Sequence, residues 1–334
     1  MLHLDLITDS AQLSTLTSEW RELQVNVSHS TPFQTPEWLL TWWRHFGSGS
    51  LRVLVCRETN RLVGLIPLFL HEWEGRRQLT LLGSGISDYL DPPILPEAAS
   101  KVACQLTKYL ADSTDWDICN WQDLSQNTSL LPCAGANPLT VRRVPDLPCS
   151  EIVIDKPFAA YWSERPAGLR RNVRRYRQKA EATSPIEIAV LDSDYQGCLD
   201  ALIRLHSARW REHGEPGMIA ANRSAAFLRD VVAQFGARQM VKFFVLYFQN
   251  STAAVILAFP YRETLYAYLS AFDPAHAAFG FGRILLFEAL HFAFENGFKS
   301  WNFLRGDEPY KFEWGARTIE KTRVIIERTP ASGK

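Results

Sequence analysis

The sequence has no excess of either charge, because its 36 lysine and arginine residues balance 36 aspartate and glutamate residues. A balanced chain exerts no long-range attraction on DNA or on an anionic membrane, so any such binding has to come from a local patch. The six cysteines form no CxxC pair and lie near no histidine at zinc-ligand spacing. We therefore expect reduced cysteines that pack as small apolar side chains, and no metal site.

Long apolar runs are also missing. No stretch approaches the length of about 18 apolar residues that a membrane-spanning helix needs, and the first residues lack the basic start and apolar stretch of a signal peptide. These absences predict a cytoplasmic protein without a transmembrane segment. At 334 residues, 46% of them hydrophobic, the chain is too long for one ordinary core, so we expect two domains.

The order strand, strand, strand, helix, strand is predicted twice along the chain. In the first half these elements are 51–58, 62–73, 78–82, the helix 96–111 and 116–121; in the second they are 241–248, 252–261, 265–272, the helix 282–296 and 299–304. Three successive antiparallel strands and a helical crossover predict a mixed sheet covered by helices, an α/β (α+β) fold present in two copies. The proline-rich stretch 122–150 predicts the boundary between domains 1–150 and 151–334.

A basic segment opens the second half. Residues 165–179 hold seven positive charges and no acid, with apolar residues and arginines on separate faces of a helix. Guanidinium groups match phosphate oxygens in bidentate pairs, which favours a phosphate-bearing partner. A solvated helix face balanced by acids elsewhere explains the same pattern.

Two glycines come directly before the last long helix, in the sequence Phe279-Gly280-Phe281-Gly282-Arg283. Glycine lets the backbone approach a ligand closely, and the unpaired amide groups of a first helical turn favour an anion such as pyrophosphate. Two glycines at this place are also typical of a tight turn without a ligand. The strands before and the helix after are the context that a phosphate site requires.

A cluster of polar side chains follows the last predicted strand of this repeat. Arg305, Asp307, Glu308, Tyr310 and Lys311 stand within seven positions, where Gly306 and Pro309 end the strand. A solvated loop whose charges pair with one another is the simpler interpretation. Titratable groups at the end of a buried strand are also how an active site is arranged.

These residues resemble a known family. The order of three antiparallel strands, Gly-x-Gly-Arg, helix and strand resembles the GNAT acyl-CoA N-acyltransferase fold. The segments 32–38, 87–92 and 303–311 are similar to the CelD/BcsL-type acetyltransferases of cellulose and exopolysaccharide synthesis, which are related to the FemABX-like transferases with two GNAT-like domains. Ala277 stands where the GNAT signature has Gln or Arg. The resemblance implies acetyl-CoA or another acyl-CoA as co-substrate, bound at Gly280, Phe281, Gly282 and Arg283.

Acyl transfer to an amine needs a base, donors for the developing oxyanion and an acid for the departing thiolate. Asp307 or Glu308 is the candidate base, Tyr310 the candidate acid, and Lys311 or Arg305 a candidate holder of an anionic group. His206 is a further candidate base, although a structural histidine on an amphipathic helix explains it as well. The candidates for substrate binding are Asp88, Tyr89, Asp91, His206, Arg209, Trp210, Tyr268 and Arg305.

Three functions fit these expectations. The first is transfer of an acyl group, acetyl above all, from acyl-CoA to an amine or hydroxyl of a small molecule, glycan or peptide precursor, with the first domain as a degenerate copy on the substrate side. The second is a FemABX-like transferase that takes an aminoacyl group from tRNA, which accounts for the arginine helix. The third is a catalytically silent component of a polysaccharide-synthesis assembly, which Ala277 favours. No residue pattern marks the acceptor or the oligomeric state.

Overall fold

The structure is a computed structural model that describes residues 2–133, 139–212 and 222–328, apart from the side chains of residues 209–212. The chain forms two compact units. The first unit contains the residues up to Leu147 together with the C-terminal segment from Glu320, and the second is Pro148–Ile319. Each unit is a mixed sheet with helices, so the predicted α/β fold class is confirmed.

The sheet of the first unit is antiparallel except at one place. Its strand order is β1-β2-β3-β4-β5-β12-β6, and the parallel pair is β4 and β5. The strands are β1 (Leu2–Ile7), β2 (Ser50–Glu58), β3 (Arg61–Trp73), β4 (Arg76–Leu81), β5 (Ile118–Ser125), β6 (Leu139–Val153) and β12 (Arg317–Arg328). Helix α4 is the crossover between β4 and β5, as a parallel pair requires.

The helices of the first unit begin where the sequence supplies caps. The hydroxyl oxygen of Thr35 accepts a hydrogen bond from the Trp38 amide at 3.2 Å, and Pro36 occupies the first helical position of α3, where its missing N–H costs nothing. The helices are α1 (Ser10–Thr15), α2 (Thr17–Val25), α3 (Pro36–Phe46), α4 (Ala99–Asp112) and the short 3₁₀ helices η1 (Pro32–Gln34) and η2 (Pro96–Ala98).

The second unit repeats this plan. Its strand order is β6-β11-β10-β9-β8-β7, and here β10 and β11 are the parallel pair. The strands are β7 (Ile186–Leu191), β8 (Lys242–Phe248), β9 (Ser251–Tyr261), β10 (Thr264–Phe272) and β11 (Ser300–Arg305), with the second half of β6. The predicted order of three strands, a helix and a strand is thus present in both units.

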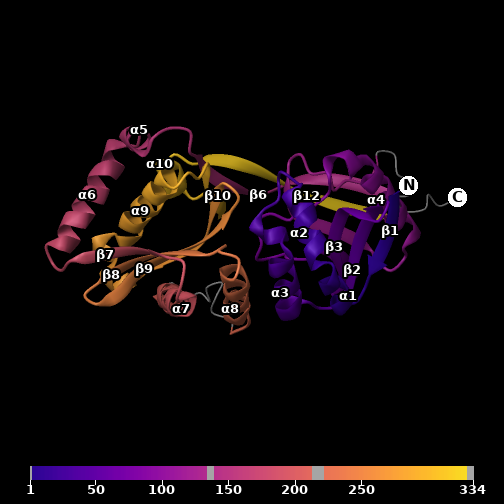
Figure 1. Ribbon diagram of the computed structural model, residues 1–334, viewed down its shortest axis with the longest axis horizontal. Coiled ribbons are helices and arrows are strands. Elements are labelled where there is room, and N and C mark those ends of the chain that lie inside the picture. The colour runs from indigo at the N-terminus through magenta and orange to yellow at the C-terminus, as the bar shows by residue number, and fades with distance from the viewer. Residues whose placement is uncertain (1, 134–138, 213–221, 329–334) are drawn as a thin grey trace. The chain divides into compact units, whose positions relative to one another are not determined.

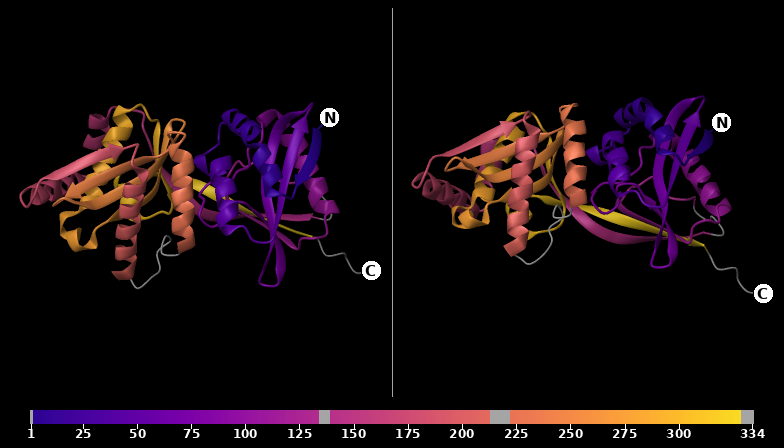
Figure 2. Two further views of the ribbon diagram at one scale, coloured as in Figure 1. Left: turned by 60° about the horizontal axis from the view of Figure 1, so that its bottom comes forward. Right: turned by 90° about the horizontal axis from the view of Figure 1, so that it is seen from below.

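Helices cover both faces of this second sheet. The helices are α5 (Phe158–Ser163), α6 (Ala167–Glu181), α7 (Tyr195–Glu212), α8 (Asn222–Gly236), η3 (Pro274–Phe279), α9 (Phe281–Glu295) and α10 (Pro309–Glu313). Figure 1 shows α9 and α6 on one face, with α7 and α8 on the other. Figure 2 shows α7 and α8 side by side, in agreement with their packing. Helix α9 is apolar around most of its circumference and is the centre of a core cluster that includes Phe244, Trp301 and Trp314.

Each unit takes its last strand from the other half of the sequence. β12 pairs with β5 in the first unit, and the second half of β6 pairs with β11 in the second. The segment predicted as a boundary, 122–150, therefore contains most of a 15-residue strand. Pro145 and Pro148 lie within β6. The two halves of β6 pair mainly with different strands, β12 and β11. Proline is tolerated where one edge of a strand has no partner, because the missing N–H is not needed for a ladder hydrogen bond.

One further expectation concerns the membrane. Among the helices that the structure describes, none is long and apolar enough to span a bilayer. In the same residues no group of three or more His, Cys, Asp or Glu side chains is placed to hold a metal ion.

Candidate active site

Strands β10 and β11 part after a short parallel ladder. Thr264, Leu265 and Tyr266 pair with Ser300, Trp301 and Asn302. Beyond these pairs β10 continues to Phe272 while β11 pairs with β6 up to Arg305. The ladder between β9 and β10 is also irregular at this level, between Ala267 and Leu269. The sheet of the second unit is therefore forked where the parallel strands end.

Tyr268 is the extra residue in the irregular part of β10. Its side chain is half-buried, and its ring centroid lies 5.2 Å from that of Phe259 on β9. A bulge redirects a side chain relative to the regular alternation of a strand. The predicted substrate-binding Tyr268 thus lies at the fork.

The glycine turn leads into α9. Gly280 has a left-handed backbone (φ 61°) and is the N-cap of the helix, with no side-chain capping bond. A Cβ at this position would lie 2.6 Å from the ring of Tyr176 on α6, so both the backbone and the close contact require glycine. Gly282 has ordinary dihedral angles, and a Cβ there would meet Phe272 at 3.4 Å. The uncapped first turn of a 15-residue helix suits an anion.

Arg283 joins this turn to the polar loop after β11. Its guanidinium contacts the Glu313 carboxylate of α10 at 3.0 Å. Phe281, by contrast, is buried in the core cluster, so its backbone but not its side chain is available to a ligand. Of the four residues predicted to bind the cofactor, Gly280, Phe281 and Gly282 can offer only backbone groups to a ligand. Arg283 also has a side chain that contacts α10.

The loop from Leu304 to Lys311 is folded around one ammonium group. Lys311 is only 2% exposed, and its Nζ donates to the carbonyl oxygens of Arg305 at 2.7 Å and Gly306 at 3.1 Å. The Glu308 carboxylate lies 2.8 Å from the same Nζ. Leu304 and Gly306 both have positive φ (62° and 107°), which bends the chain back toward the lysine. These contacts occupy the donors of Lys311.

Asp307 and Tyr310 face solvent from the same loop. Asp307 is exposed, and its carboxylate makes no hydrogen bond or ion pair with any residue that the structure describes. Tyr310 is 41% exposed and packs edge-on against Phe303, with ring centroids 6.1 Å apart. The structure thus separates the cluster into a buried, fully engaged lysine with its partner Glu308 and two accessible groups. Arg305 is half-buried at the end of β11.

The remaining predicted residues of the second unit lie on α7. His206 is 6% exposed, and α7 packs against β9 and β10. The side chains of Arg209 and Trp210 lie outside the described residues. His206 is therefore a buried residue of a helix that packs against the sheet.

In the first unit, the predicted acceptor residues lie in the loop after β4. Asp91 is 5% exposed, and its carboxylate accepts from the amide and the hydroxyl of Ser125 at 2.8 and 3.0 Å. Tyr89 is 9% exposed and Asp88 is equally buried. The Nζ atom of Lys321 lies 3.9 Å from the centroid of the Tyr89 ring. Lys321 was not predicted from the sequence, because β12 brings it to this loop from the far end of the chain.

Helix α6 is the arginine helix expected from the sequence. Leu169, Val173 and Ala180 are buried on one face, whereas the side chains of Arg170, Arg171, Arg174 and Arg175 are exposed. The helix packs along α9 and η3. Lys179 donates to the carbonyl oxygen of Ala278 at 3.2 Å. The basic face therefore extends from the glycine turn along α6.

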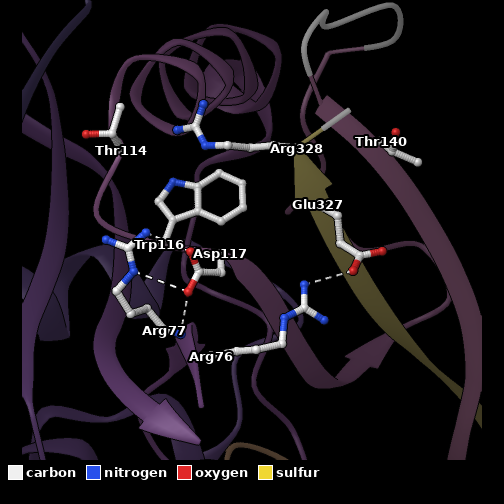
Figure 3. Close-up of a pocket in the computed structure, with 8 residues that line it drawn as sticks. All are labelled: Arg76, Arg77, Thr114, Trp116, Asp117, Thr140, Glu327 and Arg328. Atoms are coloured by element: carbon white, nitrogen blue, oxygen red, sulfur yellow. Dashed lines mark hydrogen bonds and ion pairs between the residues drawn. The ribbon is translucent and has the colours of Figure 1, made fainter. Parts of the chain in front are cut away.

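A separate pocket of about 600 Å³ lies in the first unit (Figure 3). The Arg77 guanidinium donates to the Asp117 carboxylate from two nitrogen atoms, at 2.6 and 3.2 Å. These hydrogen bonds lower the pKa of Asp117 to about 2. Arg328 lies over the Trp116 ring and donates to the last carbonyls of α4. None of the residues predicted for a site lines this pocket. Its charges pair mainly with one another, which is typical of a structural ion-pair network.

Comparison with known proteins relates these features to a family. Residues 167–312 match the family model described as an acetyltransferase (GNAT) domain. This segment contains α6, the fork, the glycine turn and the polar loop. The second unit therefore has a GNAT-like fold, and most of its residues match this acetyltransferase domain model. None of the proteins of curated function matches the sequence.

Solved structures extend the likeness to both units. FemX is 11% identical, with a TM-score of 0.66 over 96% of this chain and 96% of its own. A conserved protein of unknown function from Bacteroides thetaiotaomicron is 12% identical, with a TM-score of 0.62 over 98% and 100%. L-PGS from Bacillus licheniformis is 12% identical, with a TM-score of 0.56 over 89% and 92%. At these identities the likeness establishes the fold alone.

Proposed function

We propose that the second unit transfers an acyl group, acetyl above all, from acyl-CoA to an amine or hydroxyl acceptor. The observation that carries this proposal is the fork between β10 and β11 beside the glycine-led first turn of α9. The fork leaves strand ends without a shared ladder, and the uncapped turn offers amide groups to a pyrophosphate. The match of residues 167–312 to a GNAT acetyltransferase domain supports the same chemistry.

The two crossover helices differ in a way that supports one donor site. Helix α9 begins at Gly280 without an acidic residue in its first turn. Helix α4 follows η2, which holds Pro96 and Glu97, so the corresponding place in the first unit lacks glycine and carries an acid that repels phosphate. We therefore assign the donor to domain 151–334, at Gly280, Phe281, Gly282 and Arg283. Domain 1–150 is the degenerate copy, in which Asp88, Tyr89 and Asp91 are proposed to serve the acceptor.

The accessible groups of the polar loop suit the proton transfers. In the proposed reaction the acceptor atom attacks the thioester carbonyl carbon, the carbon–sulfur bond breaks, and coenzyme A leaves as a thiolate. Asp307 accepts the proton of the attacking group, directly or through water, and Tyr310 donates a proton to the thiolate. Glu308 is the weaker candidate base because Lys311 holds it. Lys311 is proposed to shape the loop, whereas Arg305, Tyr268, His206, Arg209 and Trp210 remain candidates for substrate contacts.

The resemblance to CelD/BcsL-type enzymes extends this proposal to acceptors of polysaccharide or cell-envelope synthesis. A catalytically silent component of such an assembly is the opposing case. Such a component binds the donor but does not turn it over. Measuring acetyl-CoA binding and turnover on the same protein therefore separates the enzyme from the silent component.

Replacing Gly282 with aspartate tests the donor site. We expect the dissociation constant for acetyl-CoA to rise at least about tenfold, because a carboxylate in the first turn repels the pyrophosphate. The fold should persist, since the helix dipole favours an acid there and the new Cβ would make an ordinary contact with Phe272. Isothermal titration calorimetry with acetyl-CoA measures the change.

Gly168→Asp is the matched control for this experiment. It places the same acid in the first turn of α6, where a Cβ meets no atom within 4 Å, and it should leave acetyl-CoA affinity unchanged. Failure of the native protein to bind acetyl-CoA at millimolar concentration would contradict the proposal. Equal affinity of the Gly282 variant and the native protein would move the donor away from the glycine turn.

The exposed arginines of α6 favour a second candidate, an aminoacyl donor carried by tRNA. Arg170 to Arg175 extend about 7.5 Å along the helix axis at roughly 1.5 Å per residue, beyond the glycine turn that Lys179 contacts. A compact pyrophosphate does not need so long a basic row, whereas a nucleic acid backbone presents a phosphate at every step. The fold of the whole chain is similar to that of FemX, which agrees with the FemABX-like resemblance on which this candidate is based.

Reversing two of these charges separates the candidates. If the donor is tRNA, Arg171→Glu combined with Arg174→Glu should weaken tRNA binding at least about tenfold and reduce its salt dependence, because two phosphate contacts are lost. Filter binding at several salt concentrations measures both quantities. Lys108→Glu combined with Lys299→Glu reverses two exposed charges elsewhere and should have little effect. No tRNA binding by the native protein at low salt would exclude this candidate.

A further inference from the structure

Two cysteine side chains of the first unit lie in contact. The Sγ atoms of Cys104 and Cys133 are 3.0 Å apart. Cys104 is exposed on α4, and Cys133 is half-buried in the segment after β5. The sequence predicts both as small apolar residues, because it contains no CxxC pair. The two cysteines are 29 positions apart.

Neighbouring hydrogen bonds hold the two thiols together. The amide of Cys133 donates to the Thr107 hydroxyl at 2.8 Å, and this hydroxyl donates to the carbonyl oxygen of Ala103 at 2.7 Å. Thr107 is one helical turn from Cys104 and shares its face. Leu130, just before Cys133, is fully buried. The approach of the sulfurs is therefore fixed from both sides.

The other four cysteines have a different environment. Cys56, Cys119, Cys149 and Cys198 are all buried. Burial raises the pKa of Cys56 to about 12 and that of Cys198 to about 11, and it shields the four thiols from a small oxidant in solution. Within the described residues, Cys104 is the one cysteine whose side chain is exposed.

We propose that Cys104 and Cys133 form an intramolecular disulfide when a small disulfide, such as oxidised glutathione, is available. The Cys104 thiolate attacks one glutathione sulfur, which releases one glutathione thiolate and leaves a mixed disulfide. Cys133 then attacks the Cys104 sulfur and releases the second glutathione. The two protons lost by the cysteines end on the two glutathione thiols, and two electrons reduce the oxidant.

The bond would tie α4 to the chain that leaves β5. A disulfide needs a sulfur separation of about 2.0 Å, so closure requires a movement of about 1 Å from the present contact. The closed loop contains the whole of β5. Closing a loop of this length restricts the unfolded chain and stabilises the folded first unit.

Mass spectrometry after treatment with oxidised glutathione tests the proposal. We expect a peptide pair that joins Cys104 to Cys133, loss of alkylation at both residues, and a rise in melting temperature of about 5–10 °C that dithiothreitol reverses. Cys104→Ser and Cys133→Ser should each abolish the rise. Cys198→Ser, which removes a buried thiol, should retain the pair and the rise after oxidation relative to its own reduced form.

Two outcomes would overturn the proposal. One is a glutathione adduct on Cys104 that persists while Cys133 remains open to alkylation, since a resolving thiol in contact would displace it. The other is free alkylation of both cysteines after prolonged exposure to the oxidant.

Discussion

Replacing Lys311 with methionine is expected to lower the free energy of unfolding by about 3 kcal/mol. The substitution keeps most of the side-chain volume but removes the donor that the carbonyl oxygens of Arg305 and Gly306 share. The Lys311 side chain is only 3% exposed, so these oxygens would lose their partner largely without water to replace it. Urea denaturation followed by tryptophan fluorescence measures the loss.

Lys299→Met is the control for this change. Lys299 is exposed at the other end of β11, and its replacement should alter the free energy of unfolding by less than about 0.5 kcal/mol. If the Lys311 variant is as stable as the native protein yet fails to bind or turn over substrate, Lys311 contacts the substrate rather than the loop. Stability and acetyl-CoA binding should therefore be measured on the same preparation.

Replacing Asp307 with asparagine is expected to reduce turnover of an acetyl acceptor at least about 100-fold, because a general base contributes about that much. The melting temperature should not change, since the carboxylate is exposed and the asparagine keeps its shape. Continuous detection of the coenzyme A thiol measures turnover. The expected pattern is therefore the opposite of that for Lys311, with activity lost and stability kept.

Asp155→Asn provides a matched loss of one exposed carboxylate in the same unit and should leave turnover unchanged. Unchanged turnover in both the Asp307 variant and Tyr310→Phe would remove the catalytic assignment. Donor binding without turnover in the native protein would instead favour the catalytically silent component.

Locally coded elements could be predicted from the sequence. The Thr35 cap, the proline after it and the glycine at the end define α3 within a few residues, and the glycine turn defines the start of α9. The Thr35 side chain caps α3, whereas the left-handed backbone of Gly280 separates η3 from α9. The physical cause lies within one turn of the chain, so a reading of adjacent residues is sufficient.

The two exchanged strands could not be predicted in the same way. Thr322 donates to the carbonyl oxygen of Val144 from 178 positions away, and the β6 segment contains two prolines that indicate a loop when read locally. Partner strands, rather than local propensity, hold β6 and β12 in place. The position of Lys321 beside Tyr89 could not be predicted either, because Lys321 belongs to β12.

The candidate site shows a similar division. The sequence concentrates five polar residues around the end of β11, and all five lie in the segment from Leu304 to Lys311. The sequence alone does not reveal which of them is buried. Burial depends on the positive φ angles of Leu304 and Gly306 and on the partner strand β6, whose Pro148 carbonyl accepts from the Gly306 amide at 2.9 Å. Composition indicates where the site lies, whereas the fold determines which side chain reaches solvent.

The origin of β12 also affects how the first unit is completed during synthesis. Gln126, next to β5, donates to the carbonyl oxygen of Lys321 from 195 positions away. At about 5–20 residues per second, the ribosome needs about 10–40 s to make the chain between them. During that time the edge of β5 has no partner from β12, and an open edge can pair with other chains. A chain cut after residue 150 lacks β12 and keeps that edge of β5 open permanently.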